Sequence, residues 1–207
     1  MLAPETSKSA VPFGVAYSLV NAQVLQSGGV TRNKRRGIMQ KRAIDPYEYA
    51  TAIAKANPKG ILFTTKSGDE VDTMIIGWGL IGNIWGRPTF TAFVRYSRHS
   101  HKLVEESGEF TINVPAGKID PQIFKVAGSE SGRDVNKVEK LGLTLVDPEV
   151  ISTPGILECP ITLECKVAYS NHIDPAGAPD YVQAFYPAGD DHVAYYGEIV
   201  AAYIIEE

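Results

Sequence analysis

Short runs of β-branched and aromatic residues, separated by glycine or proline, follow one another along the chain from residue 39. Runs of this length and composition predict β-strands. The expected strands are 61–65, 71–78, 89–96, 110–114, 143–146, 161–169, 181–185 and 192–205. Strand-helix-strand units do not repeat among them, so about eight strands with a few short helices predict a mainly β protein built on a closed or nearly closed antiparallel barrel.

Four short segments carry the signals of helix ends. Asp45 can cap a helix, Pro46 suits its first turn, Glu48 can complete a capping box, and Pro58 stops the helix after about residue 57. The other expected helices are 99–107 with Gly108 at its end, a helix from Asp120 that breaks at Gly128, and a helix capped by Asp134 that runs through Lys140. They are short and peripheral, which keeps the fold class mainly β.

The stretch 72–101 contains a literal G-x-G-x-x-G at Gly77, Gly79 and Gly82. In a dinucleotide-binding fold, the last glycine of this motif opens a helix whose amino terminus meets the pyrophosphate. Here a glycine and a proline follow at 86 and 88, so no helical period can start between them. The pattern disfavours a Rossmann site, and we interpret the glycines as a strand end followed by a loop.

The same stretch combines an apolar run with anion ligands. Residues 74–78 predict an apolar strand, and Arg98 and Ser100 stand at the start of the expected helix 99–107. First-turn helix amides favour a phosphate, and arginine binds phosphate through charge-assisted hydrogen bonds. Such a stretch is typical of a site for a flat aromatic cofactor that carries a phosphate. Arg95 is instead expected in a surface ion pair.

Other candidate side chains have simpler interpretations. Trp78 fits core packing as well as it fits a ligand wall. The pair His99-x-His101 could chelate a metal, but a third ligand is not evident, so a metal site is disfavoured. His172 and His192 fall late in the chain, where surface positions are expected for both.

The composition is that of one ordinary globular domain. The chain of 207 residues is 44% hydrophobic and 21% charged, which suffices for a sizeable core. Its formal net charge of -4 gives no electrostatic basis for general nucleic-acid binding. Cys159 and Cys165 provide neither a disulfide framework nor a zinc spacing, which fits a reducing, cytoplasmic compartment. No apolar run is long enough to span a bilayer.

Residues 1–38 differ from the rest of the chain. They mix Ser, Gly, Ala and Val without a clear period and end in a basic run at 32–36. A signal peptide would carry its positive charge before a dense apolar segment, whereas here the strong charge comes last. We therefore expect 1–38 to be a flexible or loosely packed extension and 39–207 to be the compact domain.

Four blocks of the chain, in matching order, resemble the flavin reductase-like, FMN-binding split-barrel family that includes the flavoredoxins. The blocks are TMIIGWGLIGNIWGRP (73–88), FVRYSRHSHKLVEESGEFTINVP (93–115), GSESGRDVNKVEKLGLTL (128–145) and AYYGEIVAAYIIE (194–206). The resemblance extends from Ala43 to Glu206. It implies an antiparallel split β-barrel of the Greek-key type in a homodimer, with FMN held near the subunit interface.

The resemblance also implies roles for residues at matching positions. The run 74–78 would lie along the isoalloxazine with its backbone amides at the polar edge, Arg98 and Ser100 would hold the phosphate, and Asn113 would lie at the side of the flavin. Residues of the block 128–145 would close over the cofactor. The implied cofactor-binding set is Met74, Ile75, Ile76, Gly77, Trp78, Arg98, His99, Ser100, Asn113, Ser129, Ser131, Gly132, Arg133 and Lys137.

The chain departs from the family's pattern at a few positions. His99 and His101 stand where many relatives carry aromatic residues, Ala127 stands where cysteine is frequent, and Asn136 replaces the usual acid. The missing cysteine argues against thiol chemistry but not against flavin binding. The segment 170–192 is shorter than in close relatives, which bears on the pocket mouth and on the choice of substrate.

A bound flavin would carry the redox chemistry itself, so no acid-base pair is required. The first hypothesis is an FMN flavoprotein, an oxidoreductase that passes electrons on from NAD(P)H or a protein donor. The second is a non-catalytic, flavin-binding electron carrier of the flavoredoxin type. A third, weaker one is an enzyme like pyridoxamine-phosphate oxidase. The sequence carries no recognisable nicotinamide fingerprint that would choose the donor.

Overall fold

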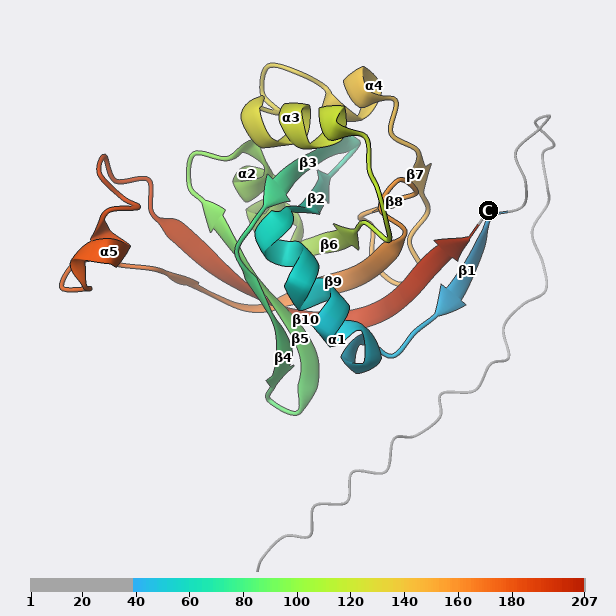
Figure 1. The fold of residues 1–207 in the computed structure, drawn as a ribbon, viewed down its shortest axis with the longest axis horizontal. Helices are drawn as coiled ribbons and strands as arrows, with labels where there is room; N and C mark the ends of the chain where they lie inside the picture. Colours follow the sequence, from blue (N-terminus) through green and yellow to red (C-terminus); the bar gives the residue numbers. More distant parts are fainter. Residues whose placement is uncertain (1–38, 207) are drawn as a thin grey trace, which may run out of the picture. The chain divides into compact units, whose positions relative to one another are not determined.

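The structure of the protein is a computed structural model, and residues 39–206 are the part that it describes. The expected extension 1–38 lies outside the described residues. The main sheet has the strand order β3-β2-β6-β9-β10-β5-β4, with β1 added beside β10 (Figure 1). Every pair of neighbours in it is antiparallel, which confirms the mainly β, antiparallel fold predicted from the hydrophobic pattern.

The elements have the following bounds. The main sheet consists of β1 (Gln40–Ala43), β2 (Ile61–Ser67), β3 (Glu70–Ile76), β4 (Gly79–Ile84), β5 (Arg87–Arg95), β6 (Glu109–Val114), β9 (Ile161–His172) and β10 (His192–Glu206). A second, two-stranded sheet consists of β7 (Leu145–Val146) and β8 (Gly155–Ile156). The helices are α1 (Pro46–Ala56), the 3-10 turn η1 (Asn57–Lys59), α2 (His99–Ser107), α3 (Pro121–Ser129), α4 (Lys137–Leu141) and α5 (Asp180–Gln183).

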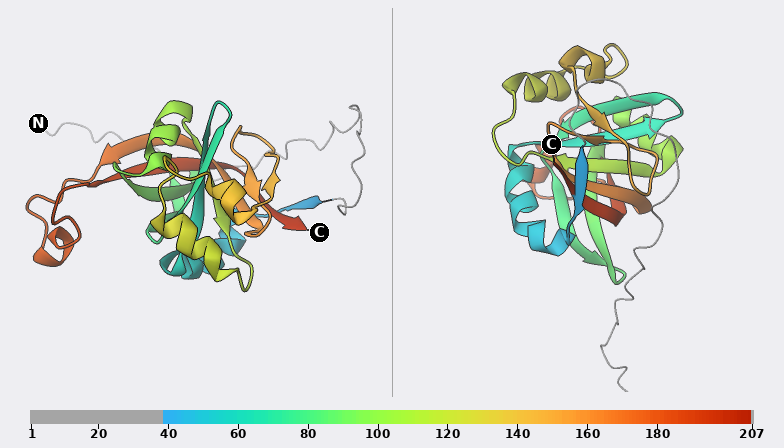
Figure 2. Two further views of the ribbon diagram at one scale, coloured as in Figure 1. Left: turned by 90° about the horizontal axis from the view of Figure 1, so that it is seen from above. Right: turned by 90° about the vertical axis from the view of Figure 1, so that its right-hand side faces the viewer.

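The curled sheet encloses an aromatic and aliphatic core. The rings of Phe63 and Phe110 lie 5.0 Å apart between centroids, with Phe90 and Tyr195 fully buried in the same cluster. A second, smaller cluster lies on the outer face of β2, where Leu62 packs with Ile123 of α3. Figures 1 and 2 show α3 and α4 side by side over this part of the sheet. Both faces of β2 are therefore covered.

Three helix boundaries follow the expected chemistry. The Asp45 side chain accepts a hydrogen bond from the Tyr47 amide at the start of α1, and Asp120 caps α3 in the same way through the Gln122 amide. Gly108 ends α2 with a φ of 66°, in the left-handed region that glycine adopts at low cost. Local signals were sufficient here because each cap involves only neighbouring residues.

The glycine-rich stretch after β3 is a strand and not the expected loop. β4 pairs with β5 from Gly79 to Ile84, and Trp85 and Gly86 close the hairpin with φ angles of 54° and 72°. Glycine has low strand propensity, which hid this strand in the sequence. Packing explains Gly79, since a Cβ there would lie 2.6 Å from Cζ of the buried Phe90.

Two other local predictions were wrong. Residues 181–185 were expected to form a strand, but they contain most of α5, in which local backbone bonds such as Ala184 N to Asp180 O replace a partner strand. The cap of α4 is Asn136, whose side chain accepts from the Glu139 amide, rather than Asp134. Aromatic composition alone does not make a strand when no neighbouring strand is in reach.

We predict that Gly79→Ala lowers the free energy of unfolding by about 1 to 3 kcal/mol, because the added methyl group overpacks the core against Phe90. Urea unfolding of the purified variant measures this change. Gly82→Ala, in the same strand, is the matched control, because no atom of residues 39–206 would lie within 4 Å of a Cβ at Gly82. Equal stabilities for the two variants would contradict the packing explanation.

Candidate functional site

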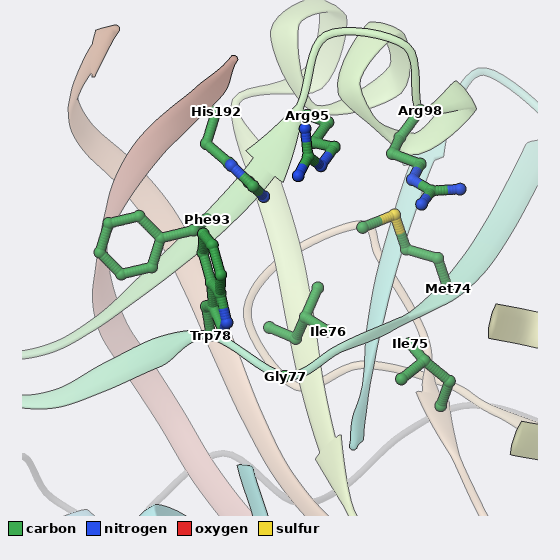
Figure 3. A pocket seen from close by; sticks show the side chains of 9 residues that line it. All are labelled: Met74, Ile75, Ile76, Gly77, Trp78, Phe93, Arg95, Arg98 and His192. Atoms are coloured by element: carbon green, nitrogen blue, oxygen red, sulfur yellow. The ribbon is translucent and has the colours of Figure 1, made fainter. Parts of the chain in front are cut away.

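A groove of about 220 Å³ runs along the end of β3. We call it the β3 groove (Figure 3), and its lining residues are Met74, Ile75, Ile76, Gly77, Trp78, Phe93, Arg95, Arg98 and His192. Among residues 39–206, β3 pairs only with β2, so its other edge carries backbone amides and carbonyls that no strand of the described part occupies. The predicted run 74–78 therefore forms an apolar wall beside a free strand edge.

A second pocket of about 200 Å³ continues from this groove at the start of α2. We call it the α2 pocket, and its lining residues are Asp72, Met74, Ile75, Ser97, Arg98, His99, Ser100, Ala127, Gly128, Ser129, Glu130, Ser131, Gly132, Arg133 and Lys137. Met74, Ile75 and Arg98 line both cavities, so the two cavities adjoin. Segments far apart in the sequence, 72–75, 97–100 and 127–137, meet here.

The amino terminus of α2 faces the α2 pocket. Its cap residue is Arg98, which provides no side-chain acceptor for the first-turn amides, and the first turn holds no acidic residue. The positive end of the helix dipole and the guanidinium of Arg98 thus act in the same place. Across the pocket Arg133 is fixed by a 2.6 Å hydrogen bond from Nη2 to the Ser97 carbonyl.

A buried ion pair supports the floor of the α2 pocket. Lys137 Nζ lies 3.0 Å from Asp72 Oδ1 and donates to the Thr73 carbonyl at 2.7 Å, and Ser100 Oγ donates to Asp72 Oδ2 at 2.6 Å. All three side chains are almost inaccessible to solvent. Gly132 makes this closeness possible, because a Cβ there would lie 2.4 Å from Asp72 Oδ1. Lys137 and Ser100 therefore line the pocket with their donors already directed at protein atoms.

The remaining predicted residues of the α2 pocket are also held by protein contacts. His99 Nε2 lies 2.6 Å from Glu70 Oε1, Ser129 Oγ donates to the Lys125 carbonyl, and Ser131 Oγ accepts from the Arg133 amide. These contacts fix the walls of the pocket. Of its lining side chains, the two arginines are the cations that take part in no ion pair within residues 39–206.

Asn113 is not brought to either cavity, so we leave it out of the site. It is fully buried, and its amide donates to Thr64 and Thr111 while its oxygen accepts from the Ile156 amide and from Thr162. An asparagine that satisfies its donors and acceptors in this way joins β2, β6, β8 and β9 inside the protein. The sequence correctly placed Asn113 on a strand, which is β6. Its side chain, however, points into the protein, toward the Ile156 amide of β8.

Arg95 and His192 were expected at the surface and instead line the β3 groove (Figure 3). Within residues 39–206, Arg95 takes part in no ion pair. Its guanidinium donates to the carbonyls of Phe185 and Asp190 at 2.9 and 2.8 Å, which ties the segment 185–190 to the groove. His192 pairs with Arg95 across β5 and β10, so only the strand register brings it to the site. No local sequence signal could have identified it.

Trp78 is a wall of the β3 groove and not a core residue. It is 39% exposed, its ring lies 4.7 Å from the His192 ring, and Phe185 meets it edge-on at 5.1 Å. His192 Nδ1 is in hydrogen-bond contact with the Tyr186 hydroxyl at 2.9 Å. Burial and the nearby Arg95 lower the pKa of His192 to about 4, so its imidazole is neutral at pH 7.

Comparison with known proteins shows the family to which this chain belongs. The family model for the flavin reductase like domain matches residues 56–207. The chain belongs to the flavin reductase-like family. The split-barrel resemblance inferred from the four sequence blocks is thereby confirmed for most of the chain.

Two archaeal relatives of the flavin reductase-like domain match over part of their length. The chain is 43% identical over 74 residues to an uncharacterized protein of Archaeoglobus fulgidus, covering 36% of this chain and 41% of that protein. It is 28% identical over 106 residues to an uncharacterized protein of Pyrococcus abyssi, covering 51% of this chain and 59% of that protein. The matched part thus spans less than two thirds of either relative.

Solved structures share the fold at low sequence identity. An FMN-binding domain of a flavin reductases-like enzyme from Shewanella baltica aligns with a TM-score of 0.55 at 22% identity, over 80% of this chain and 77% of its own. Flavoredoxin of Desulfovibrio vulgaris aligns with a TM-score of 0.54 at 22% identity, over 72% of this chain and 69% of its own. Nitrilotriacetate monooxygenase component B from Bacillus cereus aligns with a TM-score of 0.58 at 15% identity, over 87% of this chain and 84% of its own. These likenesses support the split-barrel fold. Within residues 39–206, no helix is long and apolar enough to cross a membrane.

We predict that His192 makes this flavin reductase-like domain less stable in acid. Its folded pKa is about 4 against an unfolded value of about 6.5, so its contribution is complete above pH 6.5 and is lost as the pH falls toward 4. Because the imidazole borders an open groove, we expect a loss of about 1 to 2 kcal/mol. Urea unfolding at pH 7 and pH 4.5 should show a smaller fall for His192→Gln than for the wild type. His172→Gln, at an exposed imidazole, is the control and should fall as the wild type does.

Proposed function

We propose that the protein binds FMN and acts as an oxidoreductase that passes electrons from NAD(P)H or a protein donor through the bound flavin. One observation carries this proposal. The β3 groove, with its apolar wall at residues 74–78, adjoins the cationic α2 pocket, and Met74, Ile75 and Arg98 line both. A cofactor made of a planar ring system joined to a phosphate would fit this site, with the ring in the β3 groove and the phosphate in the α2 pocket.

The charges of the site fit such a cofactor. No acidic side chain is among the residues that line the β3 groove. The α2 pocket has two acids, but Asp72 is paired with Lys137, and Glu130 lies 2.7 Å from the Lys140 ammonium group. Arg98, Arg133 and the first-turn amides of α2 then remain for a phosphate.

The residues of the chain would orient the cofactor and control its surroundings. When bound, FMN supplies the redox chemistry. The free edge of β3 at residues 74–77 offers amides and carbonyls to the polar side of a ring, and Trp78 and His192 flank the groove. His192 is neutral at pH 7 and has Tyr186 at Nδ1, so it adds a hydrogen-bonding nitrogen without a charge.

The second candidate is an electron carrier that a redox protein reduces. Aromatic side chains at the mouth of the β3 groove support it, because Trp78 is 39% and Phe185 is 52% exposed. Exposed aromatic residues are common in protein contact sites. The homodimer that the resemblance implies stays a prediction, with the exposed Leu80 and Trp85 as side chains that a second copy would cover, and sedimentation velocity checks it.

An absorbance spectrum of protein purified from a flavin-replete host tests the proposal. We expect bound flavin absorbance, or its appearance on addition of FMN to the stripped protein. A protein that stays colourless after FMN is added would refute flavin binding. Anaerobic titration with NADH and NADPH then separates the two candidates, because bleaching by either nucleotide supports the oxidoreductase and bleaching only by a redox protein supports the carrier.

We predict that Arg98→Ala weakens FMN binding by about 1.5 to 3 kcal/mol, because it removes a charge-assisted contact to the phosphate. Fluorescence titration of the apoprotein with FMN and with riboflavin measures the effect. Riboflavin lacks the phosphate, so its affinity should change little. Arg87→Ala is the matched control, since Arg87 lies at the start of β5 beside Glu198 and outside both cavities. Unchanged FMN affinity in Arg98→Ala would remove Arg98 from the site.

A further inference from the structure

A third cavity, larger than either part of the proposed flavin site, lies between the end of α1 and the segment that leads into α3. Its volume is about 470 Å³, and we call it the α1 cavity. Its lining residues are Ala52, Lys55, Ala56, Lys59, Gly60, Pro115, Ala116, Gly117, Ile119 and Phe124. None of them lines the β3 groove or the α2 pocket.

Phe124, which lines this cavity, and Ile75, which lines the proposed flavin site, come together at Gly60. A Cβ on Gly60 would lie 2.9 Å from Cε1 of Phe124 and 3.0 Å from Cγ2 of Ile75, and Gly60 has a φ of 103°. The glycine thus allows the two side chains to pack against the chain where η1 meets β2. Ile75 faces the β3 groove beyond them. The α1 cavity is therefore a separate space.

The chemistry of the α1 cavity is apolar with a positive rim. Ile119, Phe124 and Pro115 are partly buried and provide carbon surface. Lys55 and Lys59 are exposed, lie four residues apart on continuous helical turns, and thus project to one side. Neither lysine is in an ion pair within residues 39–206, and the lining contains no acid.

We propose that the α1 cavity binds a small organic anion with an apolar ring body and a carboxylate. The ring lies against Phe124 and Ile119, and the carboxylate lies between the ammonium groups of Lys55 and Lys59. The volume, the carbon surface and the two cations without paired acids all match this class of ligand. A neutral ring compound would gain no charge contact with the lysines.

A matched pair of probes tests the proposal on the full chain saturated with FMN and on the same chain without FMN. The probes are 2-naphthoate and its neutral analogue 2-naphthamide, followed by NMR titration of their aromatic protons. We expect naphthoate to bind with a dissociation constant on the order of 1 mM or tighter and naphthamide to bind at least about fivefold more weakly. FMN should not displace the naphthoate.

Three variants locate the bound probe. Lys55→Gln/Lys59→Gln should weaken naphthoate binding by about 5- to 20-fold, as expected for two exposed charge contacts, and should leave naphthamide unchanged. Ala52→Phe should weaken both probes because it fills the cavity. Lys118→Gln is the control, because Lys118 is exposed in the same loop but does not line the cavity.

Several results would overturn the proposal. Equal binding of the two probes, absence of binding, or equal effects of the Lys118 and the Lys55/Lys59 variants would each do so. Displacement of naphthoate by FMN would place the probe in the flavin site and would also refute the α1 cavity. These outcomes are independent of whether the protein proves to be an oxidoreductase.

Discussion

The buried ion pair of Asp72 and Lys137 is the interaction on which the α2 pocket depends. It joins β3 to α4, and through Ser100 it also fixes the first turn of α2. Removal of one partner from such a pair leaves a buried charge, which is strongly destabilising. Gly132 is part of the same constraint, since a Cβ there would lie 2.4 Å from Asp72 Oδ1. The charges of Asp72 and Lys137 thus compensate each other beneath the two arginines of the pocket, Arg98 and Arg133.

A second set of contacts links the mouth of the β3 groove to the α2 pocket. The Arg95 guanidinium donates hydrogen bonds to the carbonyls of Phe185 and Asp190. The Asp190 carboxylate in turn accepts hydrogen bonds from the amide and the hydroxyl of Ser97. Desolvation raises the pKa of Asp190, but the two Ser97 hydrogen bonds and the nearby Arg95 and Arg98 outweigh it and lower the pKa, so the carboxylate is charged at neutral pH. The Ser97 carbonyl also accepts a hydrogen bond from the Arg133 guanidinium. The segment 185–190 is therefore attached to the same loop that presents Arg98.

The two halves of the proposed flavin site have different physical origins. The β3 groove exists because β3 is an edge strand whose neighbour in the chain, β4, pairs with β5 on the far end of the sheet. The α2 pocket exists because α2 follows β5 after the short loop 96–98 and points its amino terminus at α3 and α4. Arg98 lies where they meet, as the last extended residue before the helix.

The sequence by itself determined the antiparallel β class, the bounds of α2, and the apolar run 74–78 beside Arg98. These features depend on local caps, on hydrophobic pattern and on neighbouring residues, and the block resemblance added the segment around Gly132. The tertiary structure alone decided that β4 is a strand, that Asn113 points into the protein, and that Arg95 and His192 line the groove. Strand register sets the position of His192 opposite Arg95, and burial of the Asp72 carboxylate depends on residues 65 positions away at Lys137. Such contacts join segments distant along the chain, so no local pattern can encode them.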